Sequence, residues 1–138
     1  MMDDQRPLVA IISSDFDEND VARFQSIVGS LSAHKWSNGL PQFFDEVDDE
    51  GCTRPEDVPV RSVGCVLFFP TNAIRDQVVE QSSYSDVSSL IGFLKAYSRD
   101  TGVEFEIEID RTYVGTIENG EANRVLEVGL LESWRMSI

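Results

Sequence analysis

The acidic residues that follow the first apolar segment are the ones whose spacing could support catalysis. Residues 8–12 form a short β-branched run, which predicts a buried strand, and Asp15 and Asp17 come soon after it. Two carboxylates one residue apart can together hold a divalent cation. A small metal-dependent hydrolase that uses Asp15 and Asp17 is therefore one hypothesis.

The segment from Ile11 to Asp17 resembles the nucleophile loop of haloacid-dehalogenase-type phosphatases. The resemblance implies that the first Asp attacks phosphorus, that the second acts as acid and base, and that both help to hold magnesium. It covers about five residues, and Asn19 stands where the family usually has Thr or Val. The chain also has only two lysines, Lys35 and Lys95. We therefore favour the alternative that Asp17 caps the following helix, with Phe16 and Val21 as a hydrophobic staple.

Other patterns for metals, cofactors and nucleophiles are incomplete. Asp15, Asp17 and Asn19 match the first ligands of a calcium loop, but Asp20 replaces its glycine and the twelfth position is not Glu. The single histidine, His34, lies near the predicted end of the first helix, where a cation complements the helix dipole. Glycine-rich phosphate loops are absent. We therefore predict no metal site, no cofactor and no enzymatic activity.

A row of acidic residues dominates the second half of the chain. Residues 103–110 alternate apolar and acidic side chains, which predicts an antiparallel strand with one solvent-facing side. Four carboxylates share that side, namely Glu104, Glu106, Glu108 and Asp110. Neighbours would lie about 6.6–6.8 Å apart, so their repulsion in water is on the order of 0.6 kcal/mol per pair. The expected partner strand offers only Arg111 at its start, so we expect the row to stay unneutralised.

The whole chain shares this acidic bias. It has 25 Asp and Glu against 11 Lys and Arg, a formal net charge of −14. Such a surface repels phosphates and anionic lipids, which disfavours direct binding to nucleic acids or membranes. It attracts basic proteins, most strongly at low salt. Solubility alone, or a halophilic host, would also explain the bias.

A second acidic region combines carboxylates with aromatic rings. Residues 43–50 begin with two phenylalanines, continue into an acidic segment, and enter a turn-rich region at 48–59 that we interpret as an exposed loop. Aromatic anchors supply binding energy and carboxylates supply charge complementarity. Together with the acidic row, the predicted contact residues here are Phe43, Phe44, Asp45, Glu46, Asp48, Asp49 and Glu50. Core packing by a strand is the alternative for the two phenylalanines.

A small acidic domain with such a surface has the properties of an inhibitor of a basic protein. Nuclease active sites are basic because they bind phosphate, so a carboxylate-rich surface can occupy them. The function that we predict is that of a bacterial immunity or inhibitor protein that neutralises a basic toxin or nuclease. The alternatives are a non-enzymatic accessory or regulatory subunit and, less favoured, the hydrolase. The sequence leaves open whether the chain forms a homo-oligomer.

The length of the chain and its mixture of expected strands and helices predict one α+β domain over residues 1–138, in which residues 1–6 form a flexible tail. Apolar periodicity predicts a helix after Asp17, a strand over 41–47, and a fully apolar strand over 63–69. A short helix near 74–79 and a second helix capped by Ser85 or Asp86 would follow. We expect a mostly antiparallel sheet of about five strands with two to four helices on it. Residues 121–136 fit either a terminal helix or a strand.

The cysteines and the N-terminus bear on location. Cys52 and Cys65 are too few for a disulfide scaffold and lack the CxxC spacing of metal or redox motifs. The polar, acidic N-terminus does not have the pattern of a signal peptide, and no apolar run approaches the ~18 residues of a membrane helix. We therefore predict a cytoplasmic protein.

Overall fold

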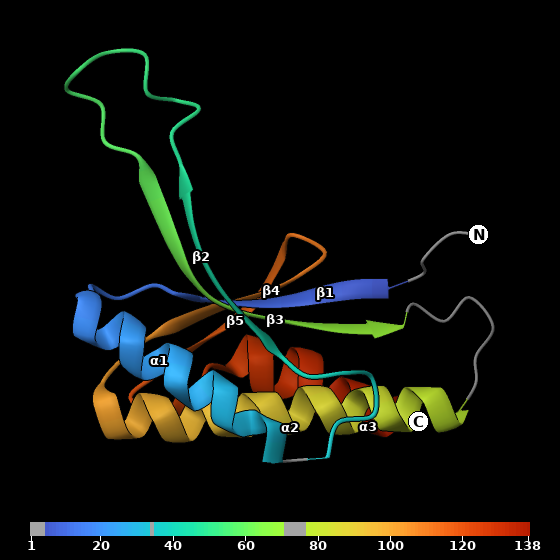
Figure 1. Cartoon of the computed structure of the whole chain (residues 1–138). Helices are drawn as coiled ribbons and strands as arrows, with labels where there is room; N and C mark the ends of the chain where they lie inside the picture. Colours follow the sequence, from blue (N-terminus) through green and yellow to red (C-terminus); the bar gives the residue numbers. More distant parts are fainter. Residues whose placement is uncertain (1–4, 34, 71–76) are drawn as a thin grey trace.

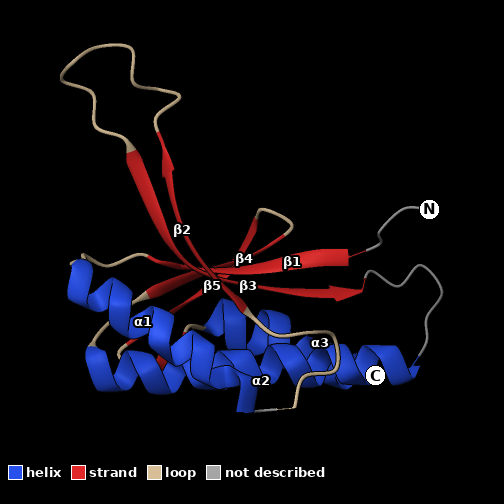
Figure 2. Cartoon of the chain, viewed as in Figure 1, coloured by secondary structure: helices blue, strands red, loops and turns tan. Residues whose placement is uncertain are grey.

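A single antiparallel sheet organises the molecule, and the helices cover one of its faces (Figures 1 and 2). The computed structural model describes residues 5–33, 35–70 and 77–138, and within them the sheet has six strands in the order β2-β3-β1-β4-β5-β6. The predicted α+β class is thereby confirmed. The strands are β1 (Gln5–Ile12), β2 (Gln42–Asp48), β3 (Val60–Pro70), β4 (Phe105–Ile109), β5 (Thr112–Glu118) and β6 (Glu121–Ala122). The helical segments are α1 (Glu18–Ser30), η1 (Leu31–Ala33), α2 (Gln77–Thr101), η2 (Val125–Glu132) and α3 (Ser133–Ser137).

The hydrophobic core lies between the helices and the covered face of the sheet. Alternate residues of the central strands point into it, because successive strand side chains face opposite sides of a sheet. Three aromatic rings mark its centre: Phe24 of α1 lies 5.4 Å from the rings of both Tyr97 and Phe105, measured between centroids. The strand side chains that pack with them are Leu8, Ala10, Ile12, Val63, Cys65, Leu67, Phe69, Ile107 and Ile109.

The start of α1 confirms the predicted helix cap. The Asp17 carboxylate accepts a hydrogen bond from the Asp20 backbone N–H at 2.9 Å, and the Asp20 carboxylate accepts one from the Asp17 N–H at 3.0 Å. This reciprocal arrangement satisfies two N–H groups that have no partner within the helix. Val21, Phe24 and Val28 then face the core.

Two predictions about the middle of the chain are wrong. Instead of a short helix and a second, separately capped one, α2 is one continuous helix from Gln77 to Thr101, and residues 71–76 lie outside the described residues. Asp86 lies within this helix, only 2% exposed, and does not cap it. Its carboxylate accepts hydrogen bonds from the backbone N–H groups of Ser37 (3.0 Å) and Asn38 (2.8 Å), which attaches the loop after α1 to α2.

The two ends of the chain settle two further questions. β1 begins at Gln5, so residues 5 and 6, which we assigned to a flexible tail, instead pair with Pro70 and Phe69 of β3. Residues 1–4 and His34 lie outside the described residues. At the other end, η2 is a stretch of π-helix that leads into α3, so the helical alternative for the terminal segment is correct from residue 125 onward.

Candidate functional site

The face of the sheet opposite the helices, which we call the open face, carries the predicted glutamates beside a set of apolar side chains. The strand register places these residues in rows that cross the sheet. One row runs through Phe44, Gly64, Ile11, Glu106 and Thr116, and the next through Gln42, Val66, Val9, Glu108 and Tyr113. Apolar side chains therefore lie on this face at Val9 and Ile11 of β1, Val66 of β3 and Phe44 of β2, and carboxylates lie on β4.

The apolar part of this face lacks a cover among the described elements, because the helices pack on the other side (Figure 1). We call the apolar residues of this face the apolar patch: Pro7, Val9, Ile11, Phe44, Val66 and Phe68. Phe68 is 37% exposed, and the other five residues are half-buried by their neighbours in the sheet. The sequence analysis missed it as a candidate surface, because an all-apolar strand is typical of burial on both faces.

Beside the apolar patch, Glu104, Glu106 and Glu108 form what we call the glutamate row. All three are half-buried, and none of them takes part in an ion pair among the described residues. The cross-strand neighbour of Glu106 is Thr116 and that of Glu108 is Tyr113. The row therefore presents uncompensated negative charge next to apolar surface.

Asp110 does not continue the row, contrary to the prediction. The chain turns at this residue, whose φ angle of 52° lies in the left-handed region. Its carboxylate accepts a hydrogen bond from Nε of Arg6 at 2.8 Å, on the helix side of the sheet. In the sequence, the alternation of apolar and acidic residues continues through Asp110, but in the structure β4 ends at Ile109 and Asp110 belongs to the hairpin turn.

The aromatic and acidic residues of β2 divide between the two faces. Phe43 packs against the core, 6.2 Å from the ring of Phe24, and Phe44 lies on the open face. Asp45 shares the side of Phe43 and accepts hydrogen bonds from Arg61 at 2.7 and 2.9 Å. Core packing is thus the correct alternative for Phe43 alone. Phe44, which is half-buried, and Glu46, which is exposed, lie on the open face.

Arg61 connects the β2–β3 hairpin to the start of α1. It bonds to Asp45 within the hairpin and to Glu18 in the first turn of α1, and its guanidinium lies 5.7 Å from the centre of the Phe16 ring. The hydrogen bond from Arg61 lowers the pKa of Asp45, and these two acidic partners raise the pKa of Arg61. Asp45 is therefore committed to an internal ion pair.

Residues 46–62, which we call the arm, project from the sheet on the side of the open face (Figure 1). Its tip holds predicted contact residues Asp48, Asp49 and Glu50, which are exposed. The Asp57 carboxylate closes the turn at the tip by accepting hydrogen bonds from the backbone N–H groups of Arg54 and Thr53, each over 3.0 Å. These hydrogen bonds lower the pKa of Asp57.

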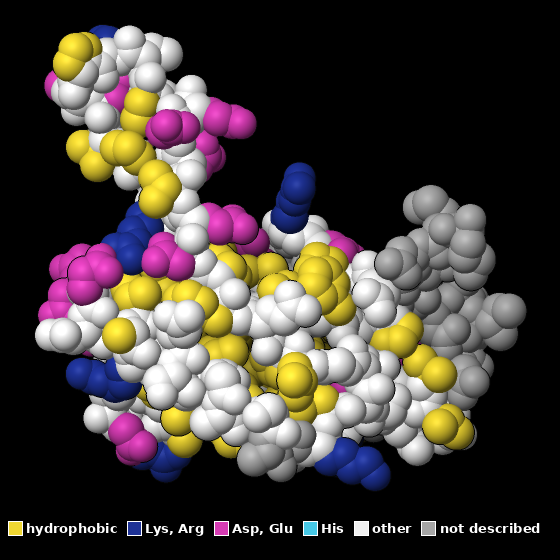
Figure 3. All heavy atoms as spheres, viewed as in Figure 1, with side chains coloured by type: hydrophobic (Ala, Val, Ile, Leu, Met, Phe, Trp, Pro, Cys, Tyr) yellow, Lys and Arg dark blue, Asp and Glu magenta, His cyan; other side chains and the backbone are white. Residues whose placement is uncertain are grey.

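Apolar side chains also line the arm (Figure 3). Val47, Val58 and Val60 are 62%, 82% and 64% exposed, which is unusual for valine. The arm and the open face thus share one composition, carboxylates interspersed with exposed apolar groups. Figure 3 shows acidic side chains gathered around the base of the arm.

The structure places no metal-binding cluster in the described residues. Within them, no group of three or more His, Cys, Asp or Glu side chains is arranged to hold an ion. One oxygen of the Asp17 carboxylate accepts the hydrogen bond of the helix cap. Cys65 is buried in the core, and this burial raises the pKa of its thiol to about 12, so that it is not a nucleophile at neutral pH.

Comparison of the chain with protein-family models, with curated proteins and with solved structures found no match. Among the described residues, no helix has the combination of length and apolar character that is needed to cross a bilayer. The chemistry of the open face and the arm is therefore the basis on which a function can be proposed.

Proposed function

We propose that this chain is a non-enzymatic protein-binding domain that holds a basic partner across its open face and arm. The observation that carries the proposal is the glutamate row beside the apolar patch: within the described part of the chain, its three carboxylates form no ion pair and no element covers the patch. Apolar area supplies the binding energy, and complementary charge sets the encounter rate and excludes wrong partners. A partner segment with apolar side chains flanked by Lys or Arg would satisfy both parts of the surface.

The specific form of the proposal is a bacterial immunity or inhibitor protein that neutralises a basic toxin such as a nuclease. An arm with exposed valines and carboxylates, standing at an angle to an acidic sheet face, is suited to enclosing a protruding basic element of a partner. A cytoplasmic location belongs to the same proposal. The alternative, an accessory or regulatory subunit, shares this surface and differs in the identity of the partner.

The test is a pull-down with the Glu104→Gln/Glu106→Gln/Glu108→Gln variant, carried out at low and at physiological salt. We expect the unmodified chain to retain a basic protein and the triple variant to bind it at least about tenfold more weakly. Raising the ionic strength should weaken the complex, because the Debye length shortens to about 8 Å at 0.15 M.

A second variant separates the open face from the net charge. Asp100→Asn/Glu132→Lys makes the same change in net charge at exposed residues outside the open face that form no ion pair among the described residues. It should bind the partner as the unmodified chain does. Equal weakening by both variants would reduce the surface to non-specific attraction. Adding the chain to the captured partner then tests for loss of nuclease activity, which separates an inhibitor from an accessory subunit.

A further inference from the structure

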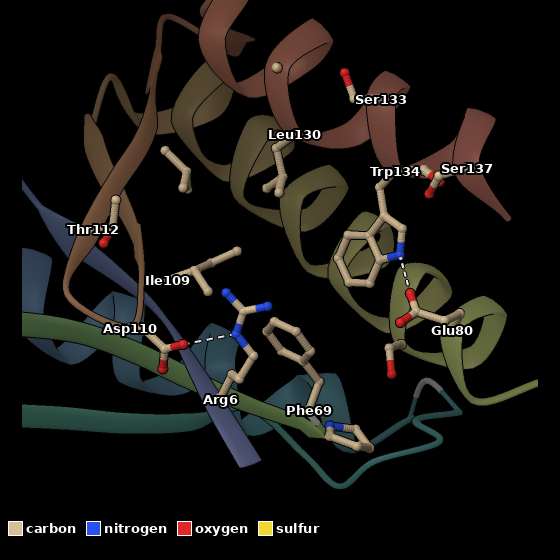
Figure 4. A pocket seen from close by; sticks show the side chains of 14 residues that line it. Arg6, Phe69, Glu80, Ile109, Asp110, Thr112, Leu130, Ser133, Trp134 and Ser137 are labelled. Atoms are coloured by element: carbon tan, nitrogen blue, oxygen red, sulfur yellow. Dashed lines mark hydrogen bonds and ion pairs between the residues drawn. The ribbon is translucent and has the colours of Figure 1, made fainter. Parts of the chain in front are cut away.

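A second surface feature lies on the helix side of the sheet, apart from the open face. It is a cavity of about 700 Å³ between the ends of β1, β3 and β4 and the terminal helices (Figure 4). Its apolar wall includes Phe69 and Ile109, which are almost fully buried, and Leu130, which is partly buried. The volume falls within the roughly 300–1,000 Å³ that is usual for small-molecule sites.

One side of the cavity is formed by Trp134, whose orientation is fixed by three contacts. Its Nε1–H donates a hydrogen bond to the Glu80 carboxylate at 2.8 Å. Its ring centroid lies 5.6 Å from that of Phe69 and 5.8 Å from that of Tyr84, the latter in an edge-on arrangement. The nitrogen edge therefore points to Glu80, and Figure 4 shows the ring facing the cavity.

The other side carries Arg6, whose guanidinium is also held in place. Nε donates to Asp110 at 2.8 Å, and the group lies 5.8 Å above the centre of the Phe69 ring. Among the described residues, the hydrogen bonds of Arg6 are confined to Nε, so both terminal nitrogens remain available. In Figure 4 these nitrogens point into the cavity. Two adjacent guanidinium N–H groups match the two oxygens of a carboxylate.

A two-residue hairpin turn carries Asp110. Asp110 and Arg111, the two residues between the paired Ile109 and Thr112, have φ angles of 52° and 66°. Both lie in the left-handed region, as such a turn requires. Asp is common at the first position, whereas Arg111 stands at the second, where Gly is usual and an ordinary residue costs roughly 1–2 kcal/mol. The turn places Asp110 against Arg6.

From these contacts we infer that the cavity binds a small carboxylic acid with a flat or branched apolar body. The carboxylate pairs with the two terminal nitrogens of Arg6, and the body lies against Trp134 and Leu130. Two carboxylates also line the cavity, and both have partners there: Asp110 is paired with Nε of Arg6, and Glu80 accepts the N–H of Trp134. More distant charges of the chain oppose binding only weakly, because charges farther away than about 8 Å are screened at physiological salt. The paired Arg–carboxylate contact is short-ranged and geometrically specific. This site is independent of the proposed partner-binding surface.

The test uses benzoate and phenylacetate as probes, with benzylamine as the cation of similar shape. Each is titrated to about 10 mM while the indole N–H signals of the two tryptophans are followed by NMR, with Trp134→Phe for assignment. We expect the carboxylates, and not the amine, to shift the Trp134 signal. Tighter binding of benzylamine, or no shift with either acid, would overturn the inference.

Two variants and a matched control locate the carboxylate. Arg6→Gln should weaken binding at least about tenfold. Arg111→Gln is the control, because Arg111 lies beside Asp110 in the turn but does not line the cavity, and it should leave binding unchanged. Leu130→Phe keeps Arg6 and fills the cavity, so it too should abolish the shift, which covers the case in which Arg6→Gln does not fold. Binding that survives both changes would contradict the site.

Discussion

The two faces of the sheet are built from the same strands and differ in what covers them. On the helix side, the strand side chains that point into the core, such as Leu8 of β1 and Ile109 of β4, are almost fully buried and apolar. On the open face, Val9, Ile11 and Val66 are also apolar but only half-buried, and the glutamate row stands beside them. Folding alone explains the first face, because burying apolar area stabilises the folded chain by roughly 25 cal/mol per Å².

Folding does not explain the second face in the same way. An exposed sheet face in an α+β protein is ordinarily polar at alternate positions, as β4 is. The apolar residues of β1 and β3 gain less by partial burial, and an uncovered apolar patch on a monomer is typical of an interaction site. We therefore attribute stability to the covered face and, in line with the proposed function, binding to the open face. Each attribution can be tested by changes that affect one face and spare the other.

The largest expected effect is that of truncating an aromatic ring on each face. Phe105→Ala removes a fully buried ring that contacts Phe24 and Tyr97, and should lower the free energy of unfolding by about 4 kcal/mol. Phe68→Ala, on the open face, should cost about 1 kcal/mol or less and should weaken partner binding. Urea denaturation measures both. Similar losses of stability from the two changes would show that the open face is part of the core.

The next effect concerns the point at which the arm leaves the sheet. A Cβ atom at Gly64 would lie 1.9 Å from the backbone oxygen of Ala10, so β3 and β1 approach more closely there than any other residue permits. Gly64→Ala should destabilise the chain by about 3 kcal/mol, since backbone atoms would have to move. Gly51→Ala, in the arm tip with open space around it, is the control and should be close to neutral. Thermal unfolding would show a mild Gly64→Ala effect if the strands can separate locally.

The fold was largely accessible from the sequence, since periodicity identified β1, α1, β3 and β4 within a few residues. The site was only partly so, and the errors have physical causes. Phe43 and Phe44 are adjacent and chemically identical, and only strand register decides that they face opposite sides. Asp110 continues the acidic alternation in sequence, but a two-residue turn redirects it to Arg6. Asp86 has the residue type of a helix cap, and the loop that it binds lies 48 residues away.

A buried carboxylate sharpens the contrast with the glutamate row. Asp86→Ala removes a buried carboxylate and leaves the N–H groups of Ser37 and Asn38 without their acceptor in a partly buried place, which should cost about 2 kcal/mol. Glu106→Ala removes a carboxylate that has no ion pair among the described residues, and should change stability by less than about 0.5 kcal/mol. Chemical denaturation of the two variants compares an acid that holds the fold with one that is available for binding. A large loss from Glu106→Ala would mean that the row is structural.

The smallest effect is a gain of stability on the covered face. The Tyr97 hydroxyl is buried and has no hydrogen-bond partner among the described residues. Tyr97→Phe keeps the ring contacts with Phe24 and Phe105 and removes the unsatisfied group, so it should stabilise the chain by up to about 1 kcal/mol.

Burial also raises the pKa of Tyr97 above its ordinary value of 10. Above pH 10 the unfolded chain therefore ionises first, and the folded chain loses stability relative to it. The advantage of Tyr97→Phe should therefore widen as the pH rises through 10. Thermal unfolding at pH 7 and pH 10.5 measures the difference, with Tyr113→Phe as the control, because the Tyr113 hydroxyl is exposed and accepts a hydrogen bond from Asn123. An unchanged gap between the two pH values would mean that water reaches the Tyr97 hydroxyl and that the covered face is less closed than its apolar packing indicates.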